Sequence, residues 1–269
     1  MAIGEATQAN VVAQPLIEIS DLSKRFQTRG GDEVVALDRI GIDIREGEFL
    51  GVVGPSGCGK TTLLKILAGL ISKTSGTVLL HGTPVEEPRR DIGVVFQRPV
   101  LLPWRTTLQN ALLPVEIQGL NRDEYRPRVL ELLELVGLKG FEEKYPFELS
   151  GGMQQRNAIV RALVCDPEIL LMDEPFGALD AMTREQMNVE LQRIWQESGK
   201  TVVFITHSIP EAVFLSDRVV VMTPRPGTVT AIYDVPLPRP RTLDVMSEPA
   251  FGSLVTSIRH HFDAIGSLD

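Results

Sequence analysis

Cysteine is scarce in this chain of 269 residues, which has only Cys58 and Cys165. Two such residues do not make the disulfide framework of a small secreted domain. Apolar runs are short, and none approaches the roughly 20 residues of a membrane-spanning helix. No basic residue precedes Lys24, so the basic start of a secretory signal peptide is missing. These absences favour a cytosolic protein that would work at a membrane only from the surface and through a partner.

Positive charge is also in short supply. The chain has 27 Lys and Arg against 35 Asp and Glu, for a net charge of −8. An acidic chain binds nucleic acid poorly by non-specific electrostatics, so we expect no nucleic-acid partner. The hydrophobic fraction of 43% is that of an ordinary globular protein and excludes wholesale disorder. The length suits one large α/β domain or two closely packed ones.

Short apolar segments alternate with helical patterns through most of the chain. A helix is predicted at 61–69, a second by the stripe Met187, Leu191, Ile194 and Trp195, and a third after a capping box at Ser208 and Glu211. Such alternation predicts an α/β fold with a mostly parallel sheet covered by helices. The predicted buried strands are 49–53, 169–172, 202–205 and 219–222. Further strands are expected at 16–20, 34–37, 40–44 and 76–81, with a turn at 30–32. Between them, Val129, Leu132, Leu133 and Val136 predict an amphipathic helix in a small helical insert.

A glycine-rich loop follows the strand at 49–53 and precedes a helix. It fits the pattern G-x-x-x-x-G-K-[ST] in the strand-to-helix context that the pattern requires. Glycines let backbone N–H groups turn toward phosphate oxygens, and the helix N-terminus adds its positive end. The alternative is a glycine-rich turn with a surface lysine, and the thiol of the loop is expected to pack rather than react. The loop consists of Gly54, Pro55, Ser56, Gly57, Cys58, Gly59, Lys60 and Thr61, and we include Thr62 with it.

Polar residues follow two of the predicted strands. Asp173 and Glu174 end the strand 169–172, and His207 follows the strand 202–205. Ligands of open parallel sheets lie beyond the carboxyl ends of the strands. There Asp173 would meet a Mg²⁺ ion opposite Thr61, and Glu174 would polarise an attacking water. The alternatives are two acids that cap a turn and a structural histidine.

A second glycine loop precedes a helix near residue 150. Ser150 is a good N-cap, and Gly151 and Gly152 leave backbone N–H groups uncovered before Gln154. This pattern predicts another anion-binding helix start, for which a single phosphate loop has no obvious need. The alternative is an ordinary capped helix after a glycine turn.

Taken together, these segments resemble the ATP-binding cassette ATPases, from about Leu16 to Met222. The first loop resembles Walker A, 169–173 resembles Walker B with Glu174 as the catalytic glutamate, and 149–154 resembles the signature motif. Gln97 resembles the Q-loop glutamine, 178–180 with Asp180 the D-loop, and His207 the switch histidine. Phe26 resembles the aromatic residue that stacks on adenine, although Phe instead of Tyr is a mild departure. Motifs in this order are very specific.

The resemblance to this family implies an activity, ligands and a dimer that the spacing of the motifs alone does not. It implies an ATPase that binds ATP and Mg²⁺, with the metal held by Thr61, Gln97 and Asp173, and with Glu174, His207 and Gln97 acting on the reaction. Two copies would face each other, with ATP between Walker A of one and Ser150, Gly151, Gly152, Gln154 and Asp180 of the other. The implied division is a flexible tail at 1–15, a RecA-like ATP-binding core with an antiparallel β subdomain at 16–97 and 161–235, a helical signature subdomain at 98–160, and a short tail at 236–269.

A narrower resemblance concerns the ATPases of nitrate, sulfonate and taurine importers. It rests on Leu101-Leu102-Pro103-Trp104 and on the proline-rich segments 224–227 and 237–240. It implies a peripheral subunit on the cytoplasmic face of the inner membrane. Two transmembrane permease subunits and, indirectly, a solute-binding protein would be its partners. Trp104 would either contact the permease or belong to the core.

Rival functions remain at this stage. An importer of an unrelated solute or a non-transport cassette ATPase is the main alternative. A DNA-repair cassette would carry a long coiled-coil insertion, whereas Gln97 and Leu149 are only 149 − 97 = 52 positions apart. An exporter half would normally be fused to membrane spans. A non-catalytic cassette fits poorly with the presence of both Glu174 and His207.

Overall fold

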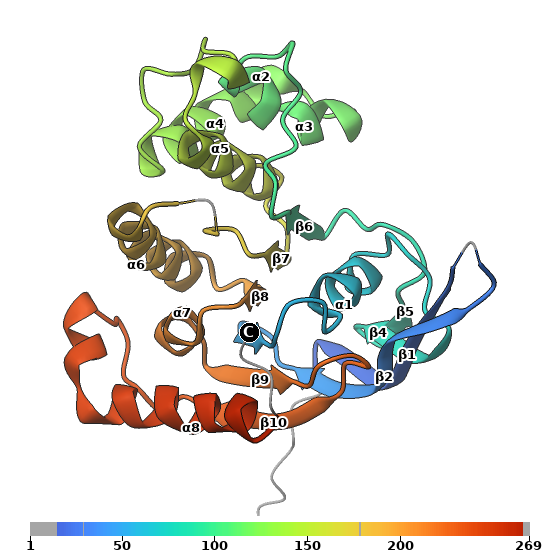
Figure 1. Cartoon of the computed structure of the whole chain (residues 1–269). Coiled ribbons are helices and arrows are strands. Elements are labelled where there is room, and N and C mark those ends of the chain that lie inside the picture. The colour runs from blue at the N-terminus through green and yellow to red at the C-terminus, as the bar shows by residue number, and fades with distance from the viewer. Residues whose placement is uncertain (1–14, 29, 178, 266–269) are drawn as a thin grey trace, which may run out of the picture.

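The strands of the computed structural model, which describes residues 15–28, 30–177 and 179–265, form two sheets (Figure 1). The larger has the order β10-β9-β3-β8-β7-β6 and the smaller the order β2-β1-β4-β5. The large sheet is parallel except for β10, which pairs antiparallel with β9. The predicted α/β class with a mostly parallel sheet is therefore confirmed. The strands are β1 (Ile17–Gln27), β2 (Glu33–Ile44), β3 (Phe49–Val53), β4 (Ser75–Leu80), β5 (Thr83–Pro84), β6 (Ile92–Val95), β7 (Ile169–Asp173), β8 (Thr201–Thr206), β9 (Arg218–Met222) and β10 (Val229–Asp234).

The helices are distributed between the faces of the large sheet and a separate lobe (Figure 1). The expected tail at 1–15 falls outside the described residues except for residue 15. The helices are α1 (Lys60–Leu67), α2 (Thr107–Ala111), α3 (Leu113–Ile117), α4 (Arg122–Leu135), α5 (Gly151–Leu163), α6 (Ala181–Ser198), α7 (Ile209–Leu215) and α8 (Pro249–Ile265), with short 3₁₀ turns at Pro146–Glu148 and Leu243–Ser247.

The central strands β3, β7 and β8 are buried at every residue. Successive side chains of a strand point to opposite faces, so a strand covered on both faces is apolar throughout. In β8, Val202 and Phe204 belong to the core formed with α5, α6, α7 and α8. Val203 and Ile205 belong to the core formed with α1 and the small sheet. The large sheet is thus the middle layer between two apolar cores.

The register of the central strands brings their carboxyl ends to one edge. Val53 pairs with Thr206, and Asp173 pairs with Ile205. The chain therefore leaves β3, β7 and β8 at the same edge of the sheet. The phosphate loop, Glu174 and His207 each follow one of these ends, so the topology brings together residues that are far apart in the sequence.

The small antiparallel sheet differs from the prediction in several strands: β1 extends beyond the predicted 16–20 to Gln27, the short β5 was not predicted, and β2 joins two predicted strands. The sequence predicted separate strands at 34–37 and 40–44, whereas β2 is continuous from Glu33 to Ile44. Its pairing with β1 shifts register opposite Arg39, whose φ is 47° and whose backbone N–H donates to the Ser23 hydroxyl. The polar pair Asp38-Arg39 therefore marks an irregularity within one strand rather than a turn between two. The turn at 30–32 is present.

Helices α2 to α5 form the lobe at the top of Figure 1, with a small apolar core of their own. Val129 and Leu133 of α4 and Val136, which caps its C-terminus, are buried, and Leu132 packs against them, as the predicted stripe requires. Helix α5 starts in this lobe and continues to Leu163 toward the large sheet. The division expected after residue 160 therefore lies within a continuous helix.

The segment 236–269, which the sequence analysis expected as a short tail, contains α8. This helix contributes Phe251, Ile258 and Phe262 to the large core. The 3₁₀ turn before α8 adds Val245 to the same core. Among the described residues, no helix, α8 included, combines the length and the apolar character needed to cross a bilayer.

Candidate functional site

The phosphate loop connects β3 to α1 in a conformation that depends on glycine. Gly59 precedes α1 with a φ of 104°, in the left-handed region that favours glycine. A Cβ at this position would lie 2.7 Å from the Ala36 carbonyl oxygen and 2.6 Å from a Leu37 methyl group. The loop therefore fits closely against β2, with its backbone turned toward the start of α1.

Lys60 is the first residue of α1, and its side chain turns back over the loop. Nζ donates to the carbonyl oxygens of Gly54 at 2.6 Å and Pro55 at 3.0 Å. The side chain is buried, which is unusual for a lysine outside a binding site. Nζ also lies 3.8 Å from Sγ of Cys58. Burial raises the pKa of that thiol although Lys60 opposes the effect, so Cys58 is a packed neutral thiol.

A cavity of about 340 Å³ opens beside the loop. Its entrance is bordered by Phe26, an aromatic residue that is 40% exposed, with Nζ of Lys24 4.9 Å from the ring centre. An exposed ring at the mouth of a cavity can stack on a planar ligand. Gly54, Pro55 and Cys58 of the loop are not among the lining residues. The lining residues are Phe26, Val34, Ala36, Ser56, Gly57, Gly59, Lys60, Thr61, Thr62, Gln97, Glu174 and Arg225.

Asp173, at the end of β7, is a buried acid next to the start of α1. Burial raises the pKa of its carboxyl group, while a hydrogen bond with Thr61 and the charge of Lys60 lower it. A carboxylate and a hydroxyl side by side are the oxygen donors that Mg²⁺ prefers, usually completed by waters and substrate phosphates. No cluster of three or more His, Cys, Asp or Glu occurs in the described chain, and such a phosphate-bound ion does not need one. Asp173 and Thr61 therefore fit the expected metal.

Gln97, Glu174 and His207 meet at a single carboxylate oxygen. Gln97 Nε2 donates to Glu174 Oε2 at 3.1 Å, and His207 Nδ1 lies 3.2 Å from the same oxygen. These side chains come from the loops after β6, β7 and β8. Glu174 has a φ of 44°, a conformation uncommon outside glycine that is found at active sites. The structure thus brings together all the residues that were expected to act on the reaction.

A buried acid that the sequence analysis assigned only to a capping box, Glu211, lies beside His207. Glu211 accepts a hydrogen bond of 2.6 Å from the Thr206 hydroxyl, and burial raises the pKa of its carboxyl group. Arg184 lies 3.5 Å from Glu211 and donates to the Leu179 carbonyl oxygen. Ser208 accepts from the Glu211 backbone, but the carboxylate turns inward. The predicted capping box is therefore only half formed.

The second glycine loop lies apart from the cavity. Ser150 caps α5 by accepting from the Met153 backbone, and Gln154 donates to the carbonyl oxygens of Pro146 and Leu149. Gly151 is exposed. Asp180 caps α6 through the Thr183 backbone, and Ala178 of the same motif lies outside the described residues. None of the predicted residues of the second loop, nor Asp180, lines the cavity of this chain.

The cavity wall also contains residues that the motifs did not indicate. Val34 and Ala36 come from β2, and Arg225 comes from the loop between β9 and β10. The proline-rich segment around Arg225 was noticed in the sequence, but no spacing rule connects it to the phosphate loop. Its place depends on the order of strands, because β9 lies next to β3.

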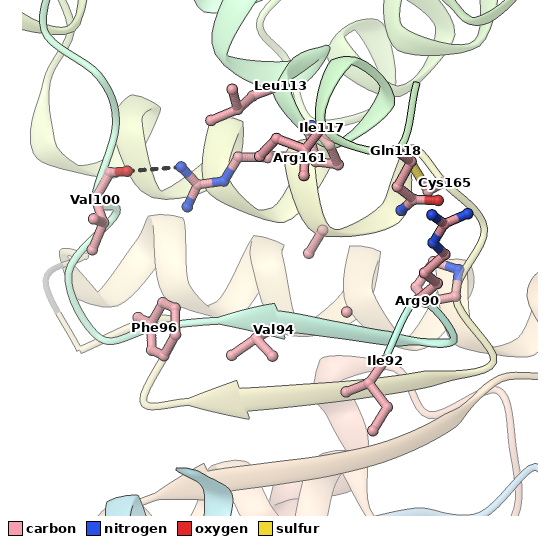
Figure 2. Close-up of a pocket in the computed structure, with 14 residues that line it drawn as sticks. Arg90, Ile92, Val94, Phe96, Val100, Leu113, Ile117, Gln118, Arg161 and Cys165 are labelled. Atoms are coloured by element: carbon pink, nitrogen blue, oxygen red, sulfur yellow. Dashed lines mark hydrogen bonds between the residues drawn. The ribbon is translucent and has the colours of Figure 1, made fainter. Parts of the chain in front are cut away.

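A second cavity, of about 370 Å³, lies between β6, α3 and α5. Figure 2 shows its mostly apolar wall, including Ile92, Val94 and Phe96, with Arg161 reaching from α5 to the Val100 carbonyl oxygen at 2.7 Å. Nearby in the sequence, Trp104 is 70% exposed. The alternative that Trp104 belongs to the core is therefore wrong. Ile117, on the cavity rim, is 75% exposed, so apolar side chains reach solvent on this side of the lobe.

Comparison with known proteins identifies relatives along most of the chain. The sequence profile of the ABC transporter family matches residues 37–177. A taurine import ATP-binding protein of Rhizobium johnstonii is 48% identical over 91% of this chain and 95% of its own length. An uncharacterised ABC transporter ATP-binding protein of Methanocaldococcus jannaschii is 53% identical over 84% of each chain. A nitrate import ATP-binding protein of Synechococcus elongatus is 46% identical over 88% of this chain and 37% of its own, longer sequence.

Solved structures that resemble this chain are also ATP-binding cassettes. A dimeric bacterial ABC transporter cassette has a TM-score of 0.75 and 36% identity, covering 81% of this chain and 98% of its own. A dimeric cassette in a post-hydrolysis state, bound to ADP and Pi, has a TM-score of 0.74 and 35% identity over the same shares.

Proposed function

We propose a function for this chain, which belongs to the ABC transporter family of ATPases. It binds and hydrolyses ATP as the cytoplasmic-face subunit of an importer. The names of its relatives favour a small anion-like solute of the taurine, sulfonate or nitrate type. The observation that carries this proposal is the meeting of Gln97, Glu174 and His207 at one oxygen beside the phosphate-loop cavity.

The residues that line the cavity would bind ATP. Ser56, Gly57 and Gly59 would present backbone N–H groups to the phosphates, and the N-terminus of α1 adds its positive end. Lys60 would exchange its bonds to the Gly54 and Pro55 carbonyl oxygens for bonds to phosphate oxygens. The adenine ring would stack on Phe26. Asp173 and Thr61, with the Gln97 amide oxygen nearby, would hold Mg²⁺, which when bound neutralises phosphate charge.

The two carboxylate oxygens of Glu174 would have different roles in hydrolysis. Gln97 and His207 both bond to Oε2, so Oε1 is the oxygen available to accept a proton from the attacking water. The two bonds fix the rotation of the carboxylate, as preorganised catalysis requires. His207 is exposed and would also reach the terminal phosphate. Each of these residues therefore has a geometrical reason for its expected role.

The second glycine loop supports a dimer in which each copy completes the other's site. Ser150 and the uncovered N–H groups of α5 form an anion-binding helix start, yet they lie outside this chain's own cavity. The solved relatives are dimers. In the proposed dimer, Ser150, Gly151, Gly152 and Gln154 face the ATP bound by the other copy, with Asp180 at the contact. The lobe that contains them corresponds to the proposed subdomain at 98–160.

Replacing Ser150 by aspartate should abolish ATP-driven dimerisation. Aspartate still caps α5, because its carboxylate accepts from the same backbone, but its charge would oppose the terminal phosphate across the interface. The measurement is light scattering with ATP in a Glu174→Gln background, which retains its nucleotide. Binding of ATP to a single chain should persist. The matched control is Ser253→Asp, at an exposed position of α8. Normal dimerisation of the Ser150→Asp chain would contradict the sandwich.

The exposed apolar surface beside the second cavity supports contact with a membrane permease. The cavity adjoins the segment that follows Gln97, and Trp104 on that segment is mostly exposed. A helical segment of a permease subunit, presenting apolar side chains, would cover this surface. Two copies of the ATPase would then bind two permease subunits, and a solute-binding protein would act on the permease from the other side.

Trp104→Ala should lower uptake and permease association without lowering stability. The side chain is 70% exposed, so its removal leaves no internal void. Co-purification with the permease, ATPase activity and uptake of labelled taurine or nitrate into vesicles are the measurements. Trp195→Ala is the control, because Trp195 packs against Phe49 in the core and its loss should lower the melting temperature by several degrees. Full uptake by the Trp104→Ala transporter would refute the contact.

A further inference from the structure

Arg225 is a cation at the phosphate loop that the expected motifs do not include. It lines the nucleotide cavity from the loop between β9 and β10. Its Nη2 lies 3.8 Å from the point that a Cβ of Gly57 would occupy. The residue is exposed, and within the described parts of the chain its guanidinium has no hydrogen-bond or ion-pair partner.

The loop that carries Arg225 is held firmly against the phosphate loop. Gly227 exchanges backbone hydrogen bonds with β2, donating to Ala36 at 3.1 Å and accepting from Asp38 at 3.0 Å. A Cβ at Gly227 would overlap the Cys58 carbonyl group. Thr223 and Thr228 close the loop through side-chain and backbone bonds. The backbone that carries Arg225 is therefore fixed by the same strand and loop that form the cavity, and its guanidinium lies beside Gly57.

The charges of the cavity leave a role for a second cation. Its wall contains Glu174 as well as Lys60, and the buried Lys60 ammonium is a point charge at the base of the loop. A guanidinium offers a planar fork of donors that matches two phosphate oxygens. In a chain of net charge −8, an exposed arginine without a carboxylate partner at this place is suited to an anionic ligand.

We propose that Arg225 is an additional nucleotide-binding residue whose guanidinium binds phosphate oxygens of ATP and ADP from the Gly57 side. The inference rests on the proposed nucleotide site and adds a residue to it. It also gives a function to the proline-rich loop after β9, whose bonds to β2 place the backbone of the arginine beside the phosphate loop. The probe is therefore the nucleotide itself, measured on the full chain.

The test is calorimetric titration of ATP and ADP with Mg²⁺. Arg225→Ala should weaken both affinities by ~10-fold, the effect of one charge-assisted bond, and should reduce their dependence on salt. Arg225→Lys should recover part of the affinity, because it restores the charge without the fork. Arg259→Ala, at an exposed position of α8, is the matched control and should bind as the parent does. An unchanged melting temperature would show that Arg225→Ala is folded.

Two results would overturn the inference. One is an Arg225→Ala chain with the affinity and salt dependence of the parent. The other is normal affinity combined with lost ATP-driven dimerisation, which would assign the arginine to a contact between copies. The variant Lys60→Ala distinguishes a wrong role for Arg225 from a wrong location of the nucleotide site. If Lys60→Ala binds ATP normally, the nucleotide binds elsewhere and the proposed site itself is wrong.

Discussion

Glu174→Gln should reduce the kcat for ATP hydrolysis by about 10²-fold or more while the chain still binds ATP, as expected for the loss of a general base. Glutamine has the shape of glutamate and can still bond to Gln97 and His207, so the geometry at the end of β7 is kept. It lacks the carboxylate that accepts a proton from water. The measurements are steady-state ATPase activity at saturating Mg²⁺ and calorimetric ATP affinity.

The control for this substitution lies at the other end of β7, outside the strand. Glu168 precedes β7 at its opposite end, where its carboxylate pairs with His81 on the surface. Glu168→Gln removes the same charge far from the cavity and should hydrolyse ATP at the parent rate. A kcat near the parent value in Glu174→Gln would contradict the role of Glu174 as the general base. Loss of ATP binding in this variant would show that Glu174 holds the site in shape rather than accepting a proton.

Arg241→Ala should cost at least about 3 kcal/mol of the free energy of unfolding, since each buried carbonyl group left without a donor costs roughly 1–3 kcal/mol. The side chain is 2% exposed, and its guanidinium binds the last carbonyls of α7, where the helix dipole is negative. Burial lowers its pKa to about 10, so it is charged at neutral pH. The accepting carbonyl oxygens belong to Val213, Phe214, Ser216, Val235 and Leu237.

Thermal and urea unfolding would measure this effect. For a chain of this size the expected cost corresponds to a decrease in melting temperature of about 6 °C or more. Arg241→Lys should be intermediate, because an ammonium group cannot reach all these carbonyls. The exposed Arg259→Ala should unfold like the parent. If Arg241→Ala also unfolds like the parent, water replaces the guanidinium and the C-terminal segment is not anchored through this residue.

The sequence carried strong signals wherever a local rule applies. The apolar strands β3, β7 and β8 and the phosphate loop were predicted close to their observed bounds, because full burial and glycine spacing are visible along a single segment. The rule for carboxyl ends placed Glu174 and His207 at one edge of the sheet, whereas Gln97 was expected there only from the family resemblance, because β6 before it was not predicted. These predictions needed no knowledge of distant packing.

Other features depend on contacts that no local pattern records. Arg225 reaches the cavity only because β9 is the neighbour of β3. Arg241 looks like a surface arginine in a proline-rich segment until the end of α7 is placed against it. Strand β10 lies at the edge of the sheet and has no fully buried residue, so its sequence lacks the continuous apolar run that marks the central strands. Tertiary packing decided each of these cases.

The fastening of α5 has a mechanical consequence. Arg161 donates to the carbonyl oxygens of Pro99 and Val100, and Gln155 donates to that of Phe96. The segment around Gln97 is therefore bonded to α5, the helix that has Ser150 at its N-terminus. If the proposed permease contact displaces Trp104, these bonds would make α5 move together with the segment. Spin labels at residues 103 and 162 should keep their separation through the ATP cycle, while the separation of labels at residues 103 and 86 changes.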